Sequence, residues 1–156
     1  VGIDFTRPHG KRFGTLVHTI MSSVDLNASE QSIEELAKIY GRLLAATDEE
    51  VGAALKLVSG ALAHPLLRSA AIAAATGNCR REIPIIMPLE NGRILEGIVD
   101  LAFQDKENGN QWIVVDYKTD FEIKGRLEEY RRQVGLYVQA IALATKQSAH
   151  GVLLRL

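Results

Sequence analysis

The stretch IVVDYKTD, residues 113–120, is an apolar run that ends abruptly in an acid, an aromatic residue and a base. Residues 112–115 all favour β-structure, and because the run is short and bounded by turn residues it predicts a buried strand rather than a helix. Asp116 and Lys118 lie two residues apart, so a strand projects both from one face and Tyr117 from the other. An ordinary ion pair explains this pattern, and so does a site that uses both charges.

A second acid, Asp100, lies inside another predicted strand, residues 93–103. If the turn at residues 104–111 pairs position 100 with position 116, the two aspartates emerge side by side on one face. A three-residue turn with Gly109 in the left-handed conformation gives this pairing, in which partner numbers sum to 216. A two-residue turn centred on Asn108 and Gly109 gives an odd sum and places the acids on opposite faces.

The remaining elements follow from periodicity and turn residues. Apolar spacing predicts a helix over residues 14–24, and residues 30–75 form a mainly helical insertion. Within the insertion we expect Ser32 and Glu35 to form a capping box, Thr47 or Asp48 to cap the next helix, and Pro65 to open a third. Two prolines mark residues 82–89 as an edge strand, and Asn91-Gly92 predicts a hairpin.

A long helix over residues 126–146 and a strand over residues 151–156 complete the predicted order. The fold class is therefore α/β: a helix, a three-strand antiparallel meander, a helix and a strand, with the helical insertion near residues 30–75. Gln133 and Tyr137 lie four residues apart, so they share one face of the long helix.

Composition limits the class of protein. The chain has 156 residues, 47% of them hydrophobic, which suits a single domain over residues 1–156. One cysteine, Cys79, excludes an internal disulfide and any four-thiolate zinc or iron-sulfur site. No apolar run reaches the ~20 residues of a membrane span and no targeting sequence is present, so we expect a cytoplasmic protein with no membrane partner. The chain begins at Val1 and has no phosphate-cradling glycine-rich loop, so we expect it to be a piece of a longer protein whose nucleotide-driven motor lies elsewhere.

The net charge of −1, from 18 basic and 19 acidic side chains, does not indicate a polyanion partner by itself. Local basic clusters are candidates to contact phosphates, although such clusters are often only solvated faces. These clusters are Arg7, Lys11 and Arg12; Arg80 and Arg81; and Lys124, Arg126, Arg131 and Arg132.

The predicted chemistry starts from the two aspartates. Two adjacent carboxylates repel one another, and a divalent cation relieves that repulsion. Oxygen ligands suit Mg²⁺ or Mn²⁺, and an added imidazole from His18 favours Mn²⁺. With Lys118 to orient a water molecule or neutralise developing charge, these residues supply the parts for hydrolysis of a phosphodiester.

Four motifs in order carry a family resemblance: Gly14-x-x-x-His18, Gly97-x-x-Asp100, residues 116–119 (DYKT) and Gln133-x-x-x-Tyr137. Together they resemble the RecB/AddA-type nuclease domain of the PD-(D/E)xK, restriction-endonuclease-like superfamily. The resemblance implies a metal-dependent DNA exonuclease domain that acts in double-strand break processing. Such a domain is typically the C-terminal piece of a helicase-nuclease, with helicase domains in the same chain and a partner helicase-nuclease subunit.

The resemblance also implies roles for individual residues. His18, Asp100 and Asp116 become ligands of Mg²⁺ or Mn²⁺, together with the Tyr117 backbone carbonyl, and Lys118 becomes the catalytic lysine. The supporting or DNA-contacting residues are Glu82, Gln133, Tyr137, Arg12 and Arg131. The single cysteine sets the chain apart from relatives that carry an iron-sulfur cluster.

Two other interpretations remain open from the sequence. A non-catalytic nucleic-acid-binding or scaffolding domain could retain the nuclease fold, although it would be expected to have lost at least one ligand. An unrelated α/β domain could carry the same acids and lysine as surface ion pairs. Aspartates on opposite faces of the sheet would favour this last interpretation.

Overall fold

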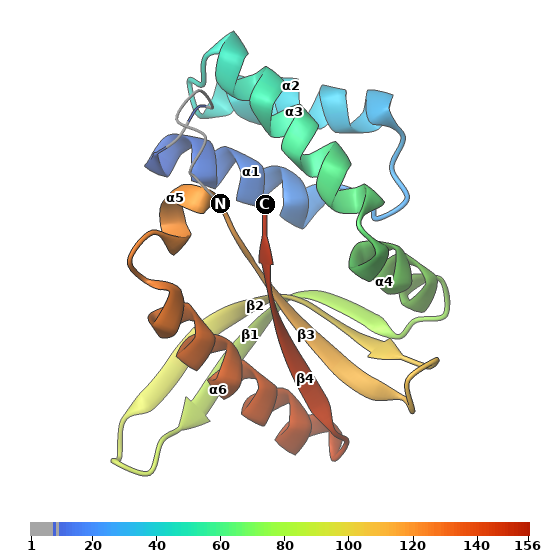
Figure 1. Cartoon of the computed structure of the whole chain (residues 1–156), viewed down its shortest axis with the longest axis vertical. Coiled ribbons are helices and arrows are strands. Elements are labelled where there is room, and N and C mark those ends of the chain that lie inside the picture. Colours follow the sequence, from blue (N-terminus) through green and yellow to red (C-terminus); the bar gives the residue numbers. More distant parts are fainter. Residues whose placement is uncertain (1–7, 9) are drawn as a thin grey trace. The chain divides into compact units, whose positions relative to one another are not determined.

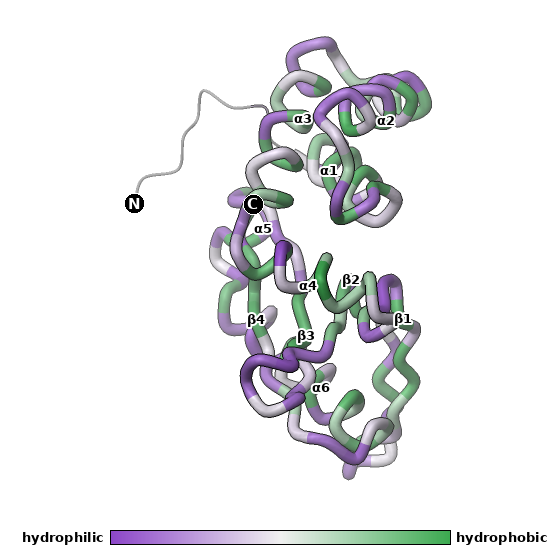
Figure 2. Tube along the Cα trace, turned by 90° about the vertical axis from the view of Figure 1, so that its right-hand side faces the viewer, coloured by the Kyte–Doolittle hydropathy of each residue, from purple (hydrophilic) through white to green (hydrophobic). Residues whose placement is uncertain are grey.

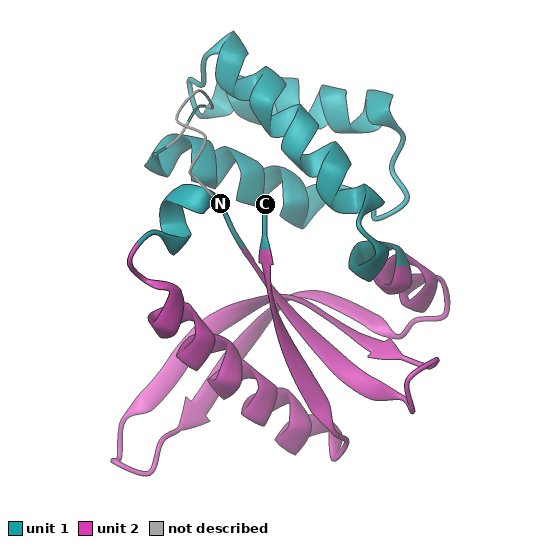
Figure 3. Ribbon diagram, viewed as in Figure 1, with its two compact units in different colours: residues 1–68, 118–124, 155–156 teal, residues 69–117, 125–154 magenta. Residues whose placement is uncertain are grey.

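A computed structural model of the chain describes residue 8 and residues 10–156. Arg7, which the sequence places in a basic cluster, lies outside these residues. The chain divides into two compact units (Figure 3). A helical unit contains residues up to 68, with residues 118–124 and 155–156, and a sheet unit contains residues 69–117 and 125–154.

The helical unit is built on α1 (Lys11–Ser23), which packs against α2 (Glu30–Leu43) and α3 (Asp48–Ala63). Leu16, Val17, Ile20 and Met21 of α1 are all fully buried, as their helical spacing predicts. The short helix α5 (Asp120–Ile123) also belongs to this unit. The sequence did not predict α5, because four residues are too few to show a periodicity.

The helix starts in the insertion are partly as predicted. Thr47 caps α3 in a capping box with Glu50. The cap of α2, however, is Ser29, whose side chain accepts a hydrogen bond from the Ser32 backbone N–H, so the predicted Ser32 box is wrong. The cap lies one turn earlier because Glu30 already has helical geometry. Pro65 opens α4 (Pro65–Ala75), as predicted.

The sheet unit contains four strands in the spatial order β1-β2-β3-β4. They are β1 (Cys79–Pro88), β2 (Ile94–Asp105), β3 (Gln111–Lys118) and β4 (Ala149–Arg155), with β3 ending at the boundary of the unit. The proline-containing strand β1 is at an edge, as its missing N–H donors predict. Figure 2 shows β3 as an apolar strand, in agreement with its buried residues 113–115.

The helix α6 (Leu127–Thr145) covers one face of the sheet (Figure 1). Tyr137 and Ile141 of α6 pack with Ile85, Val99 and Val114 of three strands in one buried cluster. The order of elements confirms the predicted α/β fold class with a restriction-endonuclease-like arrangement, including the helical insertion between α1 and the meander.

In the part of the chain that the structure describes, no single helix is long and apolar enough to cross a membrane. The helices α3 and α4 meet that test only when they are taken together across a sharp bend, by length and composition alone.

Candidate active site

The carboxyl end of β3 buries charge. Asp116 is 3% exposed, Lys118 is 9% exposed and the following Thr119 is 4% exposed. Removing a carboxylate or an ammonium group from water costs on the order of several kcal/mol per ion, unless neighbouring groups compensate for the lost hydration. The acid and the base of the DYKT motif are therefore held at the strand end instead of being solvated there.

The pairing of β2 with β3 has the predicted register. Leu101 pairs with Val115 and Ala102 with Val114, so partner numbers sum to 216. One further step along the same register, just past the last paired residues, sets Asp100 opposite Asp116. The connecting loop is longer than predicted: Asp105 pairs with Gln111, and the five residues 106–110 form the turn. Gly109 and Asn110 both have positive φ. The predicted turn and the observed turn both contain an odd number of residues, so the same residues of β2 and β3 lie opposite one another in either case.

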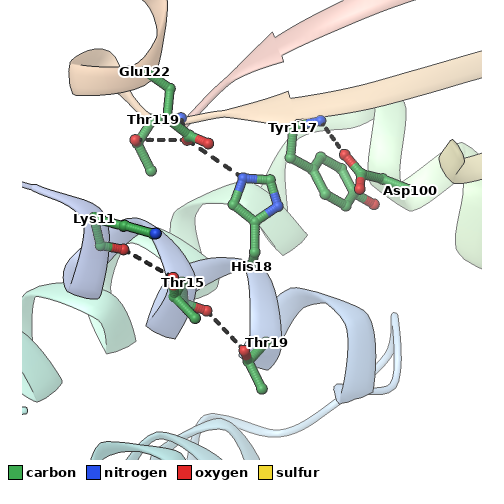
Figure 4. Close-up of polar contacts among 8 residues, drawn as sticks. All are labelled: Lys11, Thr15, His18, Thr19, Asp100, Tyr117, Thr119 and Glu122. Atoms are coloured by element: carbon green, nitrogen blue, oxygen red, sulfur yellow. Dashed lines mark hydrogen bonds and ion pairs between the residues drawn. The ribbon is translucent and has the colours of Figure 1, made fainter. Parts of the chain in front are cut away.

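Asp100 reaches the end of β3 directly. The Tyr117 backbone N–H donates a 2.6 Å hydrogen bond to Asp100 Oδ2, shown in Figure 4. A carboxylate that accepts from a backbone amide forms one of the stronger hydrogen bonds in proteins, so this contact fixes Asp100 beside residues 116–118. The Tyr117 ring itself is 2% exposed, and its burial raises the pKa of the phenol.

Glu82 lies within β1, although the sequence predicts it at the start of the first strand. The residues on either side of Glu82 pair regularly with β2, Arg81 with Leu101 and Ile83 with Val99, but the β-pairing is interrupted at Glu82. The position opposite Glu82 in this register is Asp100. Glu82 has a φ of +50°, a left-handed conformation that is uncommon for a residue other than glycine. An exposed carboxylate is thus placed across from Asp100 by an irregular backbone that no sequence pattern encodes.

His18 lies in the helical unit and faces a residue that no sequence motif singled out. His18 Nε2 is 3.4 Å from Glu122 Oε2 (Figure 4). The same carboxylate oxygen accepts 2.7 Å hydrogen bonds from the backbone N–H and the side-chain hydroxyl of Thr119. Burial acts to raise the pKa of Glu122, but the hydrogen bonds from His18 and Thr119 outweigh it and lower the pKa to about 2.

The pattern that could have revealed Glu122 is short. Thr119-x-x-Glu122 is a capping box, and it forms at the start of α5. Because the box directly follows Lys118, the threonine of the DYKT motif has a physical role. It ends the strand, caps the next helix and holds the carboxylate that faces His18.

Gly97, Gln133 and Tyr137 form one packed cluster in the sheet unit. A Cβ at Gly97 would lie 2.9 Å from Tyr137 Cε1 and closer still to the hydroxyl oxygen. Gln133 Nε2 donates a 3.0 Å hydrogen bond to that oxygen. Tyr137 is 2% exposed, which favours a supporting role over contact with DNA. The cluster holds α6 against β2 at a point three residues from Asp100.

The two arginines predicted to support the site both have carboxylate partners. Arg12 Nη2 lies 2.8 Å from Glu50 Oε2, and Arg131 Nη1 lies 2.8 Å from Glu128 Oε1. About half of the Arg12 side chain and 62% of the Arg131 side chain remain exposed. Contact of either arginine with phosphates stays a prediction.

Comparison with known proteins adds to this geometry. A model of the PD-(D/E)XK nuclease superfamily matches residues 4–156. The chain belongs to this superfamily. It is also similar to the A subunit of an ATP-dependent helicase/nuclease from Clostridium beijerinckii, with 27% identity over 155 residues that cover 82% of this chain. A second protein of the same name, from Clostridioides difficile, is 42% identical over 59 residues, 35% of this chain. The chain spans only 12% and 4% of the lengths of these two relatives.

Within this PD-(D/E)XK domain the predicted residues fall into two sets. Asp100, Asp116 and Tyr117 lie together in the sheet unit, whereas His18 belongs to the helical unit with Glu122 and Thr119. Lys118 is joined to the first set through the chain, as the last residue of β3.

The donor set suits a hard divalent cation. Asp100 and Asp116 supply carboxylate oxygens from opposing strand positions, and oxygen ligands are those that Mg²⁺ and Mn²⁺ prefer. Among residues 8 and 10–156, no group of three or more His, Cys, Asp or Glu side chains is already gathered as a metal site. The carboxylates of Asp100 and Asp116 have the chemistry that the divalent cation of this superfamily requires, and they would form part of its ligand set.

Proposed function

We propose that this chain is a Mg²⁺- or Mn²⁺-dependent deoxyribonuclease domain that acts as an exonuclease on DNA ends during double-strand break processing. The observation that carries the proposal is the hydrogen bond from the Tyr117 amide to Asp100, which holds the carboxylate of β2 against the Asp116 and Lys118 end of β3. Superfamily membership supports the reaction class, because the nuclease superfamily model matches residues 4–156.

In this proposal Asp100 and Asp116 hold the cation, together with the Tyr117 carbonyl and His18. When bound, the cation neutralises charge on the scissile phosphate and makes a water molecule more acidic. Lys118 is the only cation of the DYKT motif. Because it is buried, its charge is screened less than in water and interacts more strongly with nearby negative charge. Its role is to orient the attacking water or to offset negative charge as the phosphorus–oxygen bond breaks.

Gln133 and Tyr137 act indirectly in this proposal, because they fix the backbone of the strand that carries Asp100. Tyr137 packs on Gly97 and is hydrogen-bonded to Gln133, which holds β2 against α6. This packing keeps Asp100 of β2 at a fixed position relative to β3. Effective catalysis requires reacting groups to be held within a fraction of an ångström, which is what a packed scaffold provides.

The relatives point to a larger assembly. Both are named as the A subunit of an ATP-dependent helicase/nuclease, and the chain matches a small part of each. We propose that it works as the nuclease domain of such a chain, with helicase domains in the same polypeptide and a second, partner subunit.

Cleavage of labelled single-stranded DNA tests the proposal. The unaltered chain should cleave in Mn²⁺ or Mg²⁺ and not in excess chelator, and Asp116→Ala should be at least about 100-fold slower, because several kcal/mol of transition-state stabilisation are lost. Glu96→Ala is the matched control, since Glu96 is an exposed acid on β2, the strand that carries Asp100. Equal cleavage with chelator and in Asp116→Ala would contradict the proposal. Absence of Mn²⁺ binding by the folded chain, in a calorimetric titration at millimolar metal, would favour the scaffolding alternative, which is expected to have lost a ligand.

A further inference from the structure

Glu122 lies next to the predicted ligand His18, and the proposed mechanism gives it no role. It comes from α5, is half-buried, and its Oε2 atom receives three polar contacts within the helical unit (Figure 4). Two of these contacts come from Thr119 and one from His18.

The hydrogen-bonding chemistry of an ionised carboxylate fixes the state of its partners. A carboxylate only accepts hydrogen bonds, and the Thr119 N–H and hydroxyl are evident donors at 2.7 Å each. For the His18 contact to be favourable, Nε2 must carry the proton. A neutral imidazole in that tautomer has its lone pair on Nδ1.

The position of Glu122 is itself secured by the chain. As the third residue of the capping box, Glu122 is tied to the Thr119 backbone, directly after Lys118. Gly14 lies one turn before His18 on α1, and a Cβ there would be in ordinary van der Waals contact with Thr119 Oγ1 at 3.8 Å and with Glu122 at 3.9 Å. A residue larger than alanine would push against this pair, so the small residue lets α1 approach the box.

A second capping box in the same unit provides a comparison. Thr47 and Glu50 form a capping box at the start of α3, in which the Thr47 N–H donates to Glu50 as the Thr119 N–H donates to Glu122, but the carboxylate of Glu50 is bound by Arg12. A capping box therefore does not require a histidine partner. The His18 contact is an additional feature of the box that follows the DYKT motif.

We propose that Glu122 is a positioning residue for His18. It holds the imidazole in the Nε2–H tautomer and fixes the ring, so that Nδ1 is the nitrogen presented to the divalent cation. Metal-binding histidines commonly donate their second ring N–H to a carboxylate, and loss of such a partner typically weakens metal affinity about 10–100-fold. The part of this inference that concerns the cation rests on the proposed function, whereas the tautomer does not.

The test uses the metal-free 156-residue chain labelled with ¹⁵N, and long-range ¹H–¹⁵N spectra that report the tautomer of each histidine. His18→Gln assigns the His18 resonances. At a pH where the imidazole is neutral, we expect the Nε2–H form in the unaltered chain. In Glu122→Gln we expect a larger share of the Nδ1–H form, because the amide can turn its NH₂ group, which is a donor, toward Nε2 in place of Oε2. Glu50→Gln is the matched control and should leave the His18 tautomer unchanged.

Calorimetric titration with Mn²⁺ gives the second readout. We expect Kd to rise about 10-fold or more in Glu122→Gln and to stay within about twofold in Glu50→Gln. An unchanged tautomer or an unchanged Kd in Glu122→Gln would overturn the inference. Absence of Mn²⁺ binding by the unaltered chain would instead overturn the proposed function and the cation's part in this inference, with the spectra still deciding the tautomer.

Discussion

The packing of Tyr137 on β2 predicts that Gly97→Ala destabilises the chain. An added Cβ would lie 2.9 Å from Tyr137 Cε1 and 3.0 Å from Cζ, and closer to the hydroxyl. Real Cβ atoms essentially never come so close to other atoms, so the ring or the strand must move. The ring has little space to do so, because Tyr137 is 2% exposed and its hydroxyl accepts a hydrogen bond from Gln133.

The magnitude follows from three contributions. Overpacking of a filled core costs about 1–3 kcal/mol, and loss of the Gln133 hydrogen bond adds about 0.5–1.5 kcal/mol. Replacing a glycine within a strand returns about 0.5–1 kcal/mol of conformational entropy. The net loss of unfolding free energy is about 2 kcal/mol, which lowers Tm by about 4–8 °C for a chain of this size.

Urea unfolding measures this loss, and a double-mutant cycle with Tyr137→Phe shows whether it comes from the tyrosine. Because Tyr137→Phe removes the closest atom, Gly97→Ala should cost less in that background, with a coupling energy of about 1 kcal/mol. Gly135→Ala is the control on α6: nothing lies within 4 Å of its added Cβ, so it should be neutral or slightly stabilising. Strictly additive effects of Gly97→Ala and Tyr137→Phe would show that contact with the Tyr137 hydroxyl is not the cause of the loss.

Three further predictions follow from the caps and from Glu122. Thr47→Ala should lower the unfolding free energy by about 1 kcal/mol in urea titrations, because it removes the cap of α3; no loss would mean that the cap is not stabilising. The pKa of Glu122 is lowered from an ordinary 4.5 to about 2, so its contribution to stability is complete above about pH 4.5 and is lost as the pH falls toward 2. Relative to Glu122→Gln, the unaltered chain should therefore lose stability across that interval, and parallel pH profiles would exclude the effect. Gly14→Leu should lower Tm more than Gly14→Ala, and equal values would show that the contact of α1 with Thr119 is not tight.

Much of the sheet could be predicted because local rules determine it. The apolar residues 113–115 predict a buried strand, and β3 is one. The prolines of β1 predict an edge, and the odd length of the loop between β2 and β3 preserves the register that sets Asp100 opposite Asp116. The length of that loop could not be predicted, because Gly109 and Asn110 both adopt positive φ and either could begin a tighter turn.

The site was less predictable where it depends on tertiary contact. Gln133 and Tyr137 were expected on one helix face, but only the structure shows that Gly97 is small because Tyr137 lies over it. The left-handed backbone at Glu82 leaves no trace in sequence. Glu122 was not predicted as a site residue. Its spacing from Thr119 is that of a capping box and could have been recognised in the sequence, whereas its contact with His18 arises only when α1 and α5 meet.

Anomalous diffraction from a crystal soaked in Mn²⁺ would show whether Asp100 and Asp116 jointly hold a divalent cation. We expect one anomalous peak within about 2.0–2.4 Å of a carboxylate oxygen from each aspartate, a range that covers the usual metal–oxygen distances, and no peak in Asp116→Ala crystals. A peak elsewhere, or no peak between the two aspartates in the unaltered chain at saturating Mn²⁺, would contradict this expectation.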